Sequence, residues 1–311
     1  MLIRVRAVGI CGTDIHILRG DFPRASPPLV LGHEISGEVH TIGARVSRLK
    51  PGDRVTIDSV VGCGNCHFCL QGSPQFCPSG YEFGINRDGG CQDFLVVPEA
   101  NAFLISNAIS FEEGAILDME MYAALARCSA ADGVSALVVG DGPAGLIACQ
   151  LLRHMGAGKV ILSGQSAARM TKANELTLAD RVIDARYENV GHTIEEETKI
   201  GVDIAVDCAG TPESARQALG AVRAGGVVLL YAVYRQLLEN FDLNNIVLRD
   251  LRVFGALSDR QGWESVIALA ETGRLQLRSL ITHRFALEQA KLAFDSVKDG
   301  RDGLVKAVFI L

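Results

Sequence analysis

The sequence lacks any apolar run of the length that a membrane-spanning helix requires. Its N-terminus carries basic residues, but no sustained apolar stretch with a cleavage site follows them, so no secretory signal is predicted. Basic residues are not in excess either, because 30 Lys and Arg stand against 36 Asp and Glu, for a net charge of −6. This balance argues against a surface for nucleic acid or an anionic membrane. We therefore expect a cytoplasmic protein with no nucleic-acid or membrane partner.

The chain also lacks internal repeats and low-complexity tracts, and its 311 residues predict roughly two domains. Its character changes near residue 118. Before this point, short apolar stretches separated by turns, such as 54–57 after the Pro-Gly-Asp turn at 51–53, are typical of a β-rich module. After it, apolar strands alternate with helical patterns, which predicts a parallel, doubly wound α/β sheet.

The individual elements of this second part follow from the spacing of apolar residues. We expect strands at 135–139, 159–163, 203–207 and 226–231, and helices at 146–155, 166–176 and 214–222. Two more helices are expected at 262–271 and 287–297. The last apolar run, 304–311, is expected to form a strand that returns to the β-rich module.

Four cysteines, Cys63, Cys66, Cys69 and Cys77, follow one another in the pattern C-x2-C-x2-C-x7-C. Four thiolates at this spacing favour a closed tetrahedral Zn²⁺ site, which stabilises a lobe and performs no chemistry. An iron–sulfur cluster is the main alternative, but in the ferredoxin run the last gap is three residues rather than seven. A disulfide framework is disfavoured without a secretory signal, and the surrounding glycines and prolines indicate an irregular loop rather than a packed core. We predict a structural zinc lobe at about residues 62–78.

A glycine-rich string, GDGPAG at 140–145, follows an expected strand directly and opens an expected helix. In this context one glycine makes a tight turn, one admits a pyrophosphate, and one lets the helix pack closely on the strand. The N–H groups at the start of the helix then face the phosphates. The predicted dinucleotide-binding residues of this loop are Gly140, Gly142, Pro143, Ala144 and Gly145.

The acidic residue expected about 20 positions after such a loop is missing, because position 164 at the end of the second strand is glycine. An acid there would bind the ribose 2′-hydroxyl and repel a 2′-phosphate. Gly164 removes that discrimination, and Ser166 and Arg169 are candidate phosphate partners. Arg169 fits a solvated helix position equally well. We therefore expect NAD or NADP as cofactor, with a slight preference for the view that NADP is tolerated.

A second group of metal-ligand residue types occurs near the N-terminus, where Cys11 lies in GICGTDIH and His33 and Glu34 lie in GHEISG. Three protein ligands with an open position are typical of catalytic zinc. From the residues alone, a packed cysteine and a hydrogen-bonded histidine explain the pattern equally well.

Taken in order, the runs GICGTDIH and GHEISGEVHTIG, the four-cysteine lobe and GDGPAG resemble the zinc-dependent medium-chain dehydrogenases. They are most similar to those of the sorbitol, threonine and related polyol dehydrogenases, and the resemblance covers essentially the whole chain. It implies a GroES-like catalytic domain at 1–120 and 260–311 and a Rossmann NAD(P)-binding domain at 121–259. It also implies a homodimer or homotetramer, with the strand expected at 251–257 as a candidate for pairing between subunits.

The resemblance also implies roles for individual residues. The implied ligands of a catalytic zinc, the second zinc ion of the chain, are Cys11, His33 and Glu34. Thr13 and His16 are implied to carry the alcohol proton away, and Asp14 is implied to support the zinc-bound histidine.

The chain departs from the family at two places. Sorbitol-type members carry Glu-Pro after a stretch like FEEGA, where this chain has Asp118 and Met119. Asp118 is one methylene shorter than glutamate, so we expect it to reach the zinc through water, and Glu120 is the alternative ligand. The chain also begins just ahead of GICGTD, where relatives have further strands, and we expect such a truncation to leave an unpaired sheet edge.

These features predict an oxidoreductase that transfers hydride between NAD(P) and a secondary alcohol, such as a polyol, a sugar acid or a small hydroxy compound. The alternative is a catalytically impaired nucleotide-binding protein of the same fold that retains only the structural zinc. The number of zinc ions per chain distinguishes the two. A zinc-free reductase is disfavoured because both zinc motifs are present.

Overall fold

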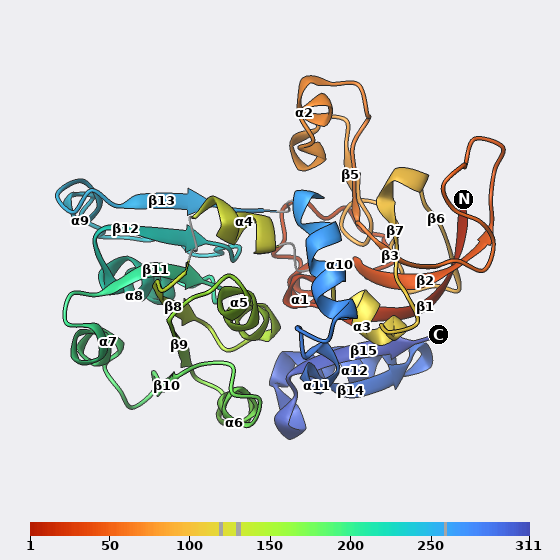
Figure 1. Cartoon of the computed structure of the whole chain (residues 1–311). Helices are drawn as coiled ribbons and strands as arrows, with labels where there is room; N and C mark the ends of the chain where they lie inside the picture. Colours follow the sequence, from red (N-terminus) through yellow and green to blue (C-terminus); the bar gives the residue numbers. More distant parts are fainter. Residues whose placement is uncertain (118–120, 129–131, 258–259) are drawn as a thin grey trace. The chain divides into compact units, whose positions relative to one another are not determined.

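The computed structural model of the chain describes residues 1–117, 121–128, 132–257 and 260–311. The chain divides into two compact units, which are unit 1 (Met1–Glu120 and Ser258–Leu311) and unit 2 (Met121–Leu257). Figure 1 shows the β-rich elements of unit 1 and the α/β elements of unit 2. Within the described ranges, every helix is too short or too polar to cross a membrane.

Unit 1 is built around a seven-stranded sheet in the order β14-β15-β1-β2-β3-β7, with β6 also paired to β1. Its strands are β1 (Leu2–Ile10), β2 (Glu34–Thr41), β3 (Arg54–Ile57), β6 (Phe94–Val96), β7 (Ala102–Leu104), β14 (Ile281–Ala286) and β15 (Lys306–Ile310). β1 has antiparallel neighbours on both sides, β15 and β2. The last strand of the chain therefore returns to the first module, as predicted. β1 is therefore paired on both sides.

Short elements connect the strands of unit 1. They are α1 (Gly12–Arg19), β4 (Val60–Val61), α2 (His67–Leu70), η1 (Pro74–Phe76), β5 (Tyr81–Glu82), η2 (Glu99–Asn101), α3 (Phe111–Ala115), η3 (Arg260–Gly262), α10 (Trp263–Glu271), α11 (Leu277–Leu280), η4 (Leu287–Gln289), α12 (Ala290–Asp299) and η5 (Arg301–Gly303). The helix expected at 262–271 is present as α10. The one expected at 287–297 begins as a 3₁₀ turn and continues as α12.

Unit 2 contains a six-stranded parallel sheet in the order β10-β9-β8-β11-β12-β13. Its strands are β8 (Ser135–Val139), β9 (Lys159–Gly164), β10 (Arg181–Asp184), β11 (Val202–Asp207), β12 (Val222–Leu230) and β13 (Arg252–Gly255). Its helices are α4 (Met121–Arg127), α5 (Pro143–His154), α6 (Ala167–Glu175), α7 (Val190–Thr198), α8 (Pro212–Ala221) and α9 (Asn244–Val247). Helices α5 and α6 lie on one face of the sheet and α7 and α8 on the other (Figure 1), so the sheet is doubly wound as predicted.

The predicted elements of unit 2 agree with the structure in type and order. Strand 135–139 matches β8, and the helices and other strands differ from their predicted bounds by a few residues at most. The central strands were detectable because both of their faces are buried, which gives continuous apolar runs. β10 and α7 were not among the expected elements. Their apolar residues are sparse, since α7 contains three consecutive glutamates.

An aromatic pair contributes to the packing of helix α10 against the edge of the unit 1 sheet. Trp263, the only tryptophan of the chain, is 1% exposed and stacks on Phe103 of β7, with ring centroids 5.3 Å apart and an interplanar angle of 12°. Its indole N–H has no hydrogen-bond partner among the described residues. The contribution of Trp263 is therefore apolar burial and stacking.

We expect Trp263→Ala to lower the free energy of unfolding by about 3–5 kcal/mol, because it leaves a cavity beside Phe103. Trp263→Phe should cost less, since a ring is kept for stacking, the cavity is smaller and the donor that is removed has no partner among the described residues. Denaturant unfolding followed by circular dichroism measures both variants. Equal stability of the alanine variant and the unchanged protein would contradict this packing.

Candidate metal and cofactor sites

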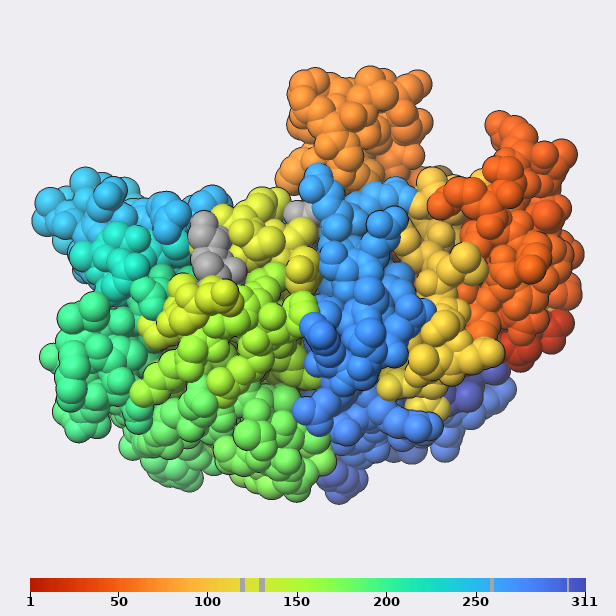
Figure 2. Space-filling model, in the orientation of Figure 1, coloured from red at the N-terminus to blue at the C-terminus, as the bar shows by residue number. Residues whose placement is uncertain are grey.

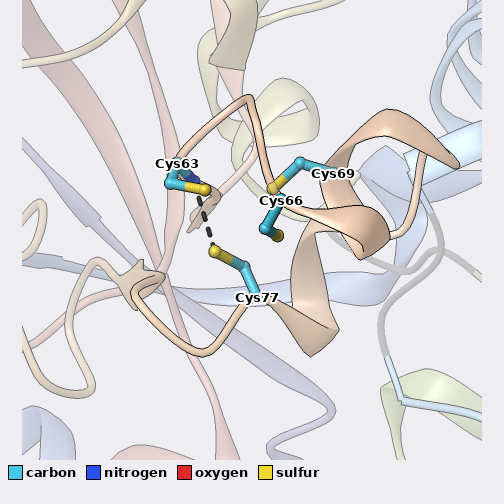
Figure 3. Close-up of side chains that lie close together, drawn as sticks. All are labelled: Cys63, Cys66, Cys69 and Cys77. Atoms are coloured by element: carbon cyan, nitrogen blue, oxygen red, sulfur yellow. Dashed lines mark hydrogen bonds between the residues drawn. The ribbon is translucent and has the colours of Figure 1, made fainter.

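The four cysteines of the predicted zinc lobe come together in space. Their Sγ atoms all lie within 4.8 Å of one another, and the backbone N–H of Cys63 donates to Cys77 Sγ at 3.3 Å (Figure 3). Sulfur atoms bound tetrahedrally at about 2.3 Å to one Zn²⁺ lie about 3.8 Å apart, which is below this 4.8 Å limit. The spacing therefore fits a single tetrahedral ion. All nine cysteines lie in the described part of the chain and are free thiols, so the disulfide alternative is not observed.

The local backbone explains how this lobe forms. Cys66 precedes helix α2 and Cys69 lies within it, while Gly64 and Gly72 take φ values of 80° and 74° that only glycine adopts at little cost. Backbone N–H groups of Asn65 and Cys66 lower the pKa of Cys63 to about 6. The loop thus supplies a thiolate, which is the form that binds metal. Figure 2 shows this segment, in orange, projecting from the rest of unit 1.

A second cluster, Cys11, His33 and Glu34, also lies in unit 1, and its three candidate ligand atoms are within 4.8 Å of one another. Cys11 precedes α1, His33 immediately precedes β2, and Glu34 is the first residue of that strand. His33 and Glu34 are 8% and 1% exposed. A thiol, an imidazole and a carboxylate at this spacing match the ligand types and distances of a zinc site.

Asp14 lies behind His33 in this cluster. Its Oδ2 accepts a hydrogen bond from the backbone N–H of Cys11 at 2.8 Å, and its Oδ1 is 3.5 Å from His33 Nδ1. Burial lowers the pKa of His33, but the charges and hydrogen bonds of Asp14 and Cys11 raise it well above its ordinary value. The cluster therefore has an electronegative character that favours a cation.

A residue that the sequence analysis missed, Lys306, completes the cluster. Its Nζ lies 2.6 Å from each carboxylate oxygen of Glu34, and the two side chains are 2% and 1% exposed. Gly9 of β1 lies directly opposite Glu34, and a Cβ on this glycine would come within 1.8 Å of Glu34 Oε2. Glycine at position 9 thus leaves room for the buried ion pair. The signal in the sequence was a lone lysine in the otherwise apolar final strand.

The two residues of the expected proton path lie on α1. Thr13 Oγ1 is 3.8 Å from Cys11 Sγ, and His16 Nδ1 is 3.3 Å from Asp21 Oδ1. Thr13 and His16 are three positions apart on the helix, a spacing that places side chains on one face. Asp118 and Glu120, the two candidates for a further zinc ligand, lie outside the described residues.

The glycine-rich loop of unit 2 connects β8 to α5. Gly140 has a φ of 109°, and a Cβ on Gly145 would come within 1.8 Å of Gly140 O, so the helix packs closely on the strand. A Cβ on Gly142 would meet nothing within 4 Å. An approach path to the backbone is therefore open at the start of α5, where Pro143 and Ala144 begin the first turn and N–H groups lack helical partners. This geometry fits a bound pyrophosphate.

The remaining predicted cofactor residues surround the next turn of unit 2. Gly164 ends β9, Ser166 precedes α6, and Arg169 lies in the first turn of that helix. The backbone N–H of Ser166 donates to Asp141 at 2.7 Å. Asp141, inside the glycine-rich loop, is a further residue that the sequence analysis did not single out.

Comparisons with known proteins show which family the chain belongs to. Residues 1–107 match the alcohol dehydrogenase GroES-like domain, and residues 143–272 match the zinc-binding dehydrogenase family. L-threonine 3-dehydrogenase of Pectobacterium carotovorum is 32% identical, over 98% of this chain and 90% of that protein.

Solved structures of dehydrogenases are similar to the chain as well. A zinc-binding dehydrogenase from Sinorhizobium meliloti, determined with NADP, has a TM-score of 0.91 and 31% identity, over 100% of this chain and 92% of that one. The 2R,3R-butanediol dehydrogenase of Bacillus subtilis has a TM-score of 0.89 and 26% identity, over 100% and 92%. The chain belongs to the zinc-dependent medium-chain dehydrogenases, NAD(P)-dependent alcohol dehydrogenases, in the branch of the threonine and polyol enzymes.

Proposed function

We propose that this alcohol dehydrogenase oxidises a secondary alcohol reversibly to a ketone. The observation that carries the proposal is the cluster of Cys11, His33 and Glu34, three different ligand types within 4.8 Å of one another. L-threonine and 2,3-butanediol, named in the descriptions of two relatives, both carry a secondary hydroxyl group. A polyol, a sugar acid or a small hydroxy compound is the proposed substrate class.

In this proposal Cys11, His33 and Glu34 hold the catalytic zinc, and the four cysteines of the lobe hold a structural one. When bound, Zn²⁺ supplies a Lewis acid and NAD(P)⁺ supplies a hydride acceptor. Asp14 supports the site by facing His33 Nδ1, which leaves the other ring nitrogen for the metal. A ligand from the segment of Asp118 or Glu120 stays a prediction.

Oxidation of an alcohol removes one hydride and one proton, so the chain needs a route for the proton. The hydroxyl of Thr13, beside Cys11, is the proposed first acceptor. His16, three residues further along α1, is the proposed next group, and its ring nitrogen faces the carboxylate of Asp21. That carboxylate would stabilise the protonated imidazole.

Lys306 has a proposed positioning role. Its ammonium group faces both oxygens of Glu34, which fixes the carboxylate next to Cys11 and His33 and balances its charge. With a Cys11 thiolate and the carboxylates of Glu34 and Asp14, the local charge is −3, and one lysine and one divalent cation bring it to zero. The ion pair and the metal are therefore complementary.

The subunit number stays a prediction. β13 lies within 251–257, the segment that was considered for pairing between subunits. It is at the edge of the sheet of unit 2, and β12 is its neighbour in the described residues. A homodimer or homotetramer through this edge is consistent with that position.

A substrate panel tests the proposed reaction. We expect NADH or NADPH to form when polyols, sugar acids, 2,3-butanediol or L-threonine are supplied. Secondary alcohols should be oxidised faster than primary alcohols of equal size. Absorbance at the reduced nicotinamide band measures the rate. Turnover restricted to primary alcohols would contradict the proposed substrate class.

We expect Cys11→Ser to lower turnover by at least about a thousandfold, because the Lewis acid is worth several kcal/mol in the transition state. Zinc content should fall from two ions to one per chain, since the four-cysteine lobe is untouched. Cys128→Ala, which removes a buried thiol from unit 2, is the matched control and should keep both ions. One ion in the unchanged protein, with cofactor binding retained, would favour the catalytically impaired alternative.

We expect Lys306→Met to lower the free energy of unfolding by about 3–5 kcal/mol, because it leaves the Glu34 carboxylate buried without its partner. Adding Glu34→Gln should recover most of this loss, since no unpaired charge remains. Denaturant unfolding of the metal-free proteins gives the coupling free energy between positions 34 and 306. Strictly additive effects would show that the ion pair does not form.

A further inference from the structure

The carboxylate of Asp141 occupies an unusual place for a residue of a dinucleotide-binding loop. Asp141 is the second residue of the string at 140–145, yet its side chain reaches the turn after the next strand. Its Oδ2 accepts hydrogen bonds from the backbone N–H groups of Gln165 at 2.9 Å and Ser166 at 2.7 Å. The residue is 7% exposed. Asp141 thus links the glycine-rich loop to the start of α6.

The position of Asp141 excludes any side chain at position 164. A Cβ built on Gly164 would meet three atoms of Asp141, at 2.5, 2.7 and 2.8 Å, and these are its three nearest neighbours. No side chain fits at position 164 while Asp141 keeps its place. Glycine there does not leave an open space, because a carboxylate from the glycine-rich loop fills it.

In related folds, the acid at the end of the second strand binds the hydroxyls of the adenine ribose and disfavours a 2′-phosphate. We propose that Asp141 does this work here from the glycine-rich loop, so that the enzyme binds NAD(H) in preference to NADP(H). The inference rests on the proposed dehydrogenase function. It reverses the expectation, drawn from Gly164 alone, that discrimination is lost.

The groups around Asp141 support the same preference. The N–H groups of Gln165 and Ser166, which a 2′-phosphate would need, already bind the carboxylate. Arg186, whose charge interacts with Asp141, makes two hydrogen bonds to Asp184 at 2.8 and 2.6 Å. A 2′-phosphate would therefore meet a buried negative charge, and it would find these N–H groups and the Arg186 guanidinium already engaged.

Binding of NADH and NADPH to the zinc-loaded protein, measured by isothermal titration calorimetry, tests the assignment without any turnover. We expect the unchanged protein to bind NADH at least about tenfold more tightly than NADPH, from the repulsion between like charges. Asp141→Asn keeps an oxygen that accepts both N–H bonds but removes the charge. It should shift the ratio of the two Kd values towards NADPH by about tenfold or more. Glu175→Gln, the same charge change at the other end of α6, is the control and should leave the ratio unchanged.

A second variant moves the acid to the usual place. Asp141→Gly empties the space beside position 164, and Gly164→Asp added to it should restore the preference for NADH that the single Asp141→Gly variant loses. A ratio unaltered by Asp141→Asn, or an unchanged protein that prefers NADPH, would overturn the assignment while leaving the dehydrogenase function intact. Failure of the unchanged protein to bind either cofactor would overturn both. Thermal melting of each variant confirms that it is folded.

Discussion

The buried ion pair between Glu34 and Lys306 is the constraint that ties the candidate metal cluster to the sheet of unit 1. It joins a strand near the start of the chain to the last strand, across β1, which lies between them. Burying two charges is costly, and their mutual attraction offsets this cost only when the geometry is tight. Here each carboxylate oxygen is 2.6 Å from the ammonium nitrogen. A packed apolar pair would stabilise the sheet as well or better, so its retention next to Cys11 and His33 points to the metal site rather than to stability.

Most of the fold could be predicted from the sequence because its signals are local. The buried parallel strands of unit 2 are continuous apolar runs, and the glycine-rich loop and the cysteine lobe are contiguous motifs whose spacing reflects one turn or one ion. What escaped prediction depends on contacts between distant residues. Lys306 lies 272 positions from Glu34, and Asp141 faces a turn 24 and 25 residues further on. No local pattern records such partners, and β10 and α7 escaped because their apolar periodicity is weak.

The candidate metal cluster of unit 1 and the glycine-rich loop of unit 2 share one structural arrangement. In each, a glycine faces a carboxylate supplied by a neighbouring segment, Gly9 against Glu34 and Gly164 against Asp141. A Cβ on either glycine would approach the carboxylate to within 2.5 Å or less. Such a glycine is required by the side chain of another residue and not by its own backbone conformation, because neither takes a positive φ. In a parallel or antiparallel sheet, where neighbouring strands are less than 5 Å apart, glycine is the residue that makes room for a polar group crossing a strand.

This arrangement of a glycine against a carboxylate changes how a missing residue in a sequence motif is interpreted. The absence of an acid at position 164 indicates lost discrimination between NAD and NADP only if the space beside this position is empty. Because Asp141 fills that space and takes up the N–H groups of the turn, the electrostatic character of the ribose site is kept although the motif position is not. The same reasoning applies to the candidate metal cluster of Cys11, His33 and Glu34, where the charge balance includes Lys306, a residue outside every motif. In this fold the position of a charge in space matters more than its position in a motif, and a loop can supply that charge as well as a strand.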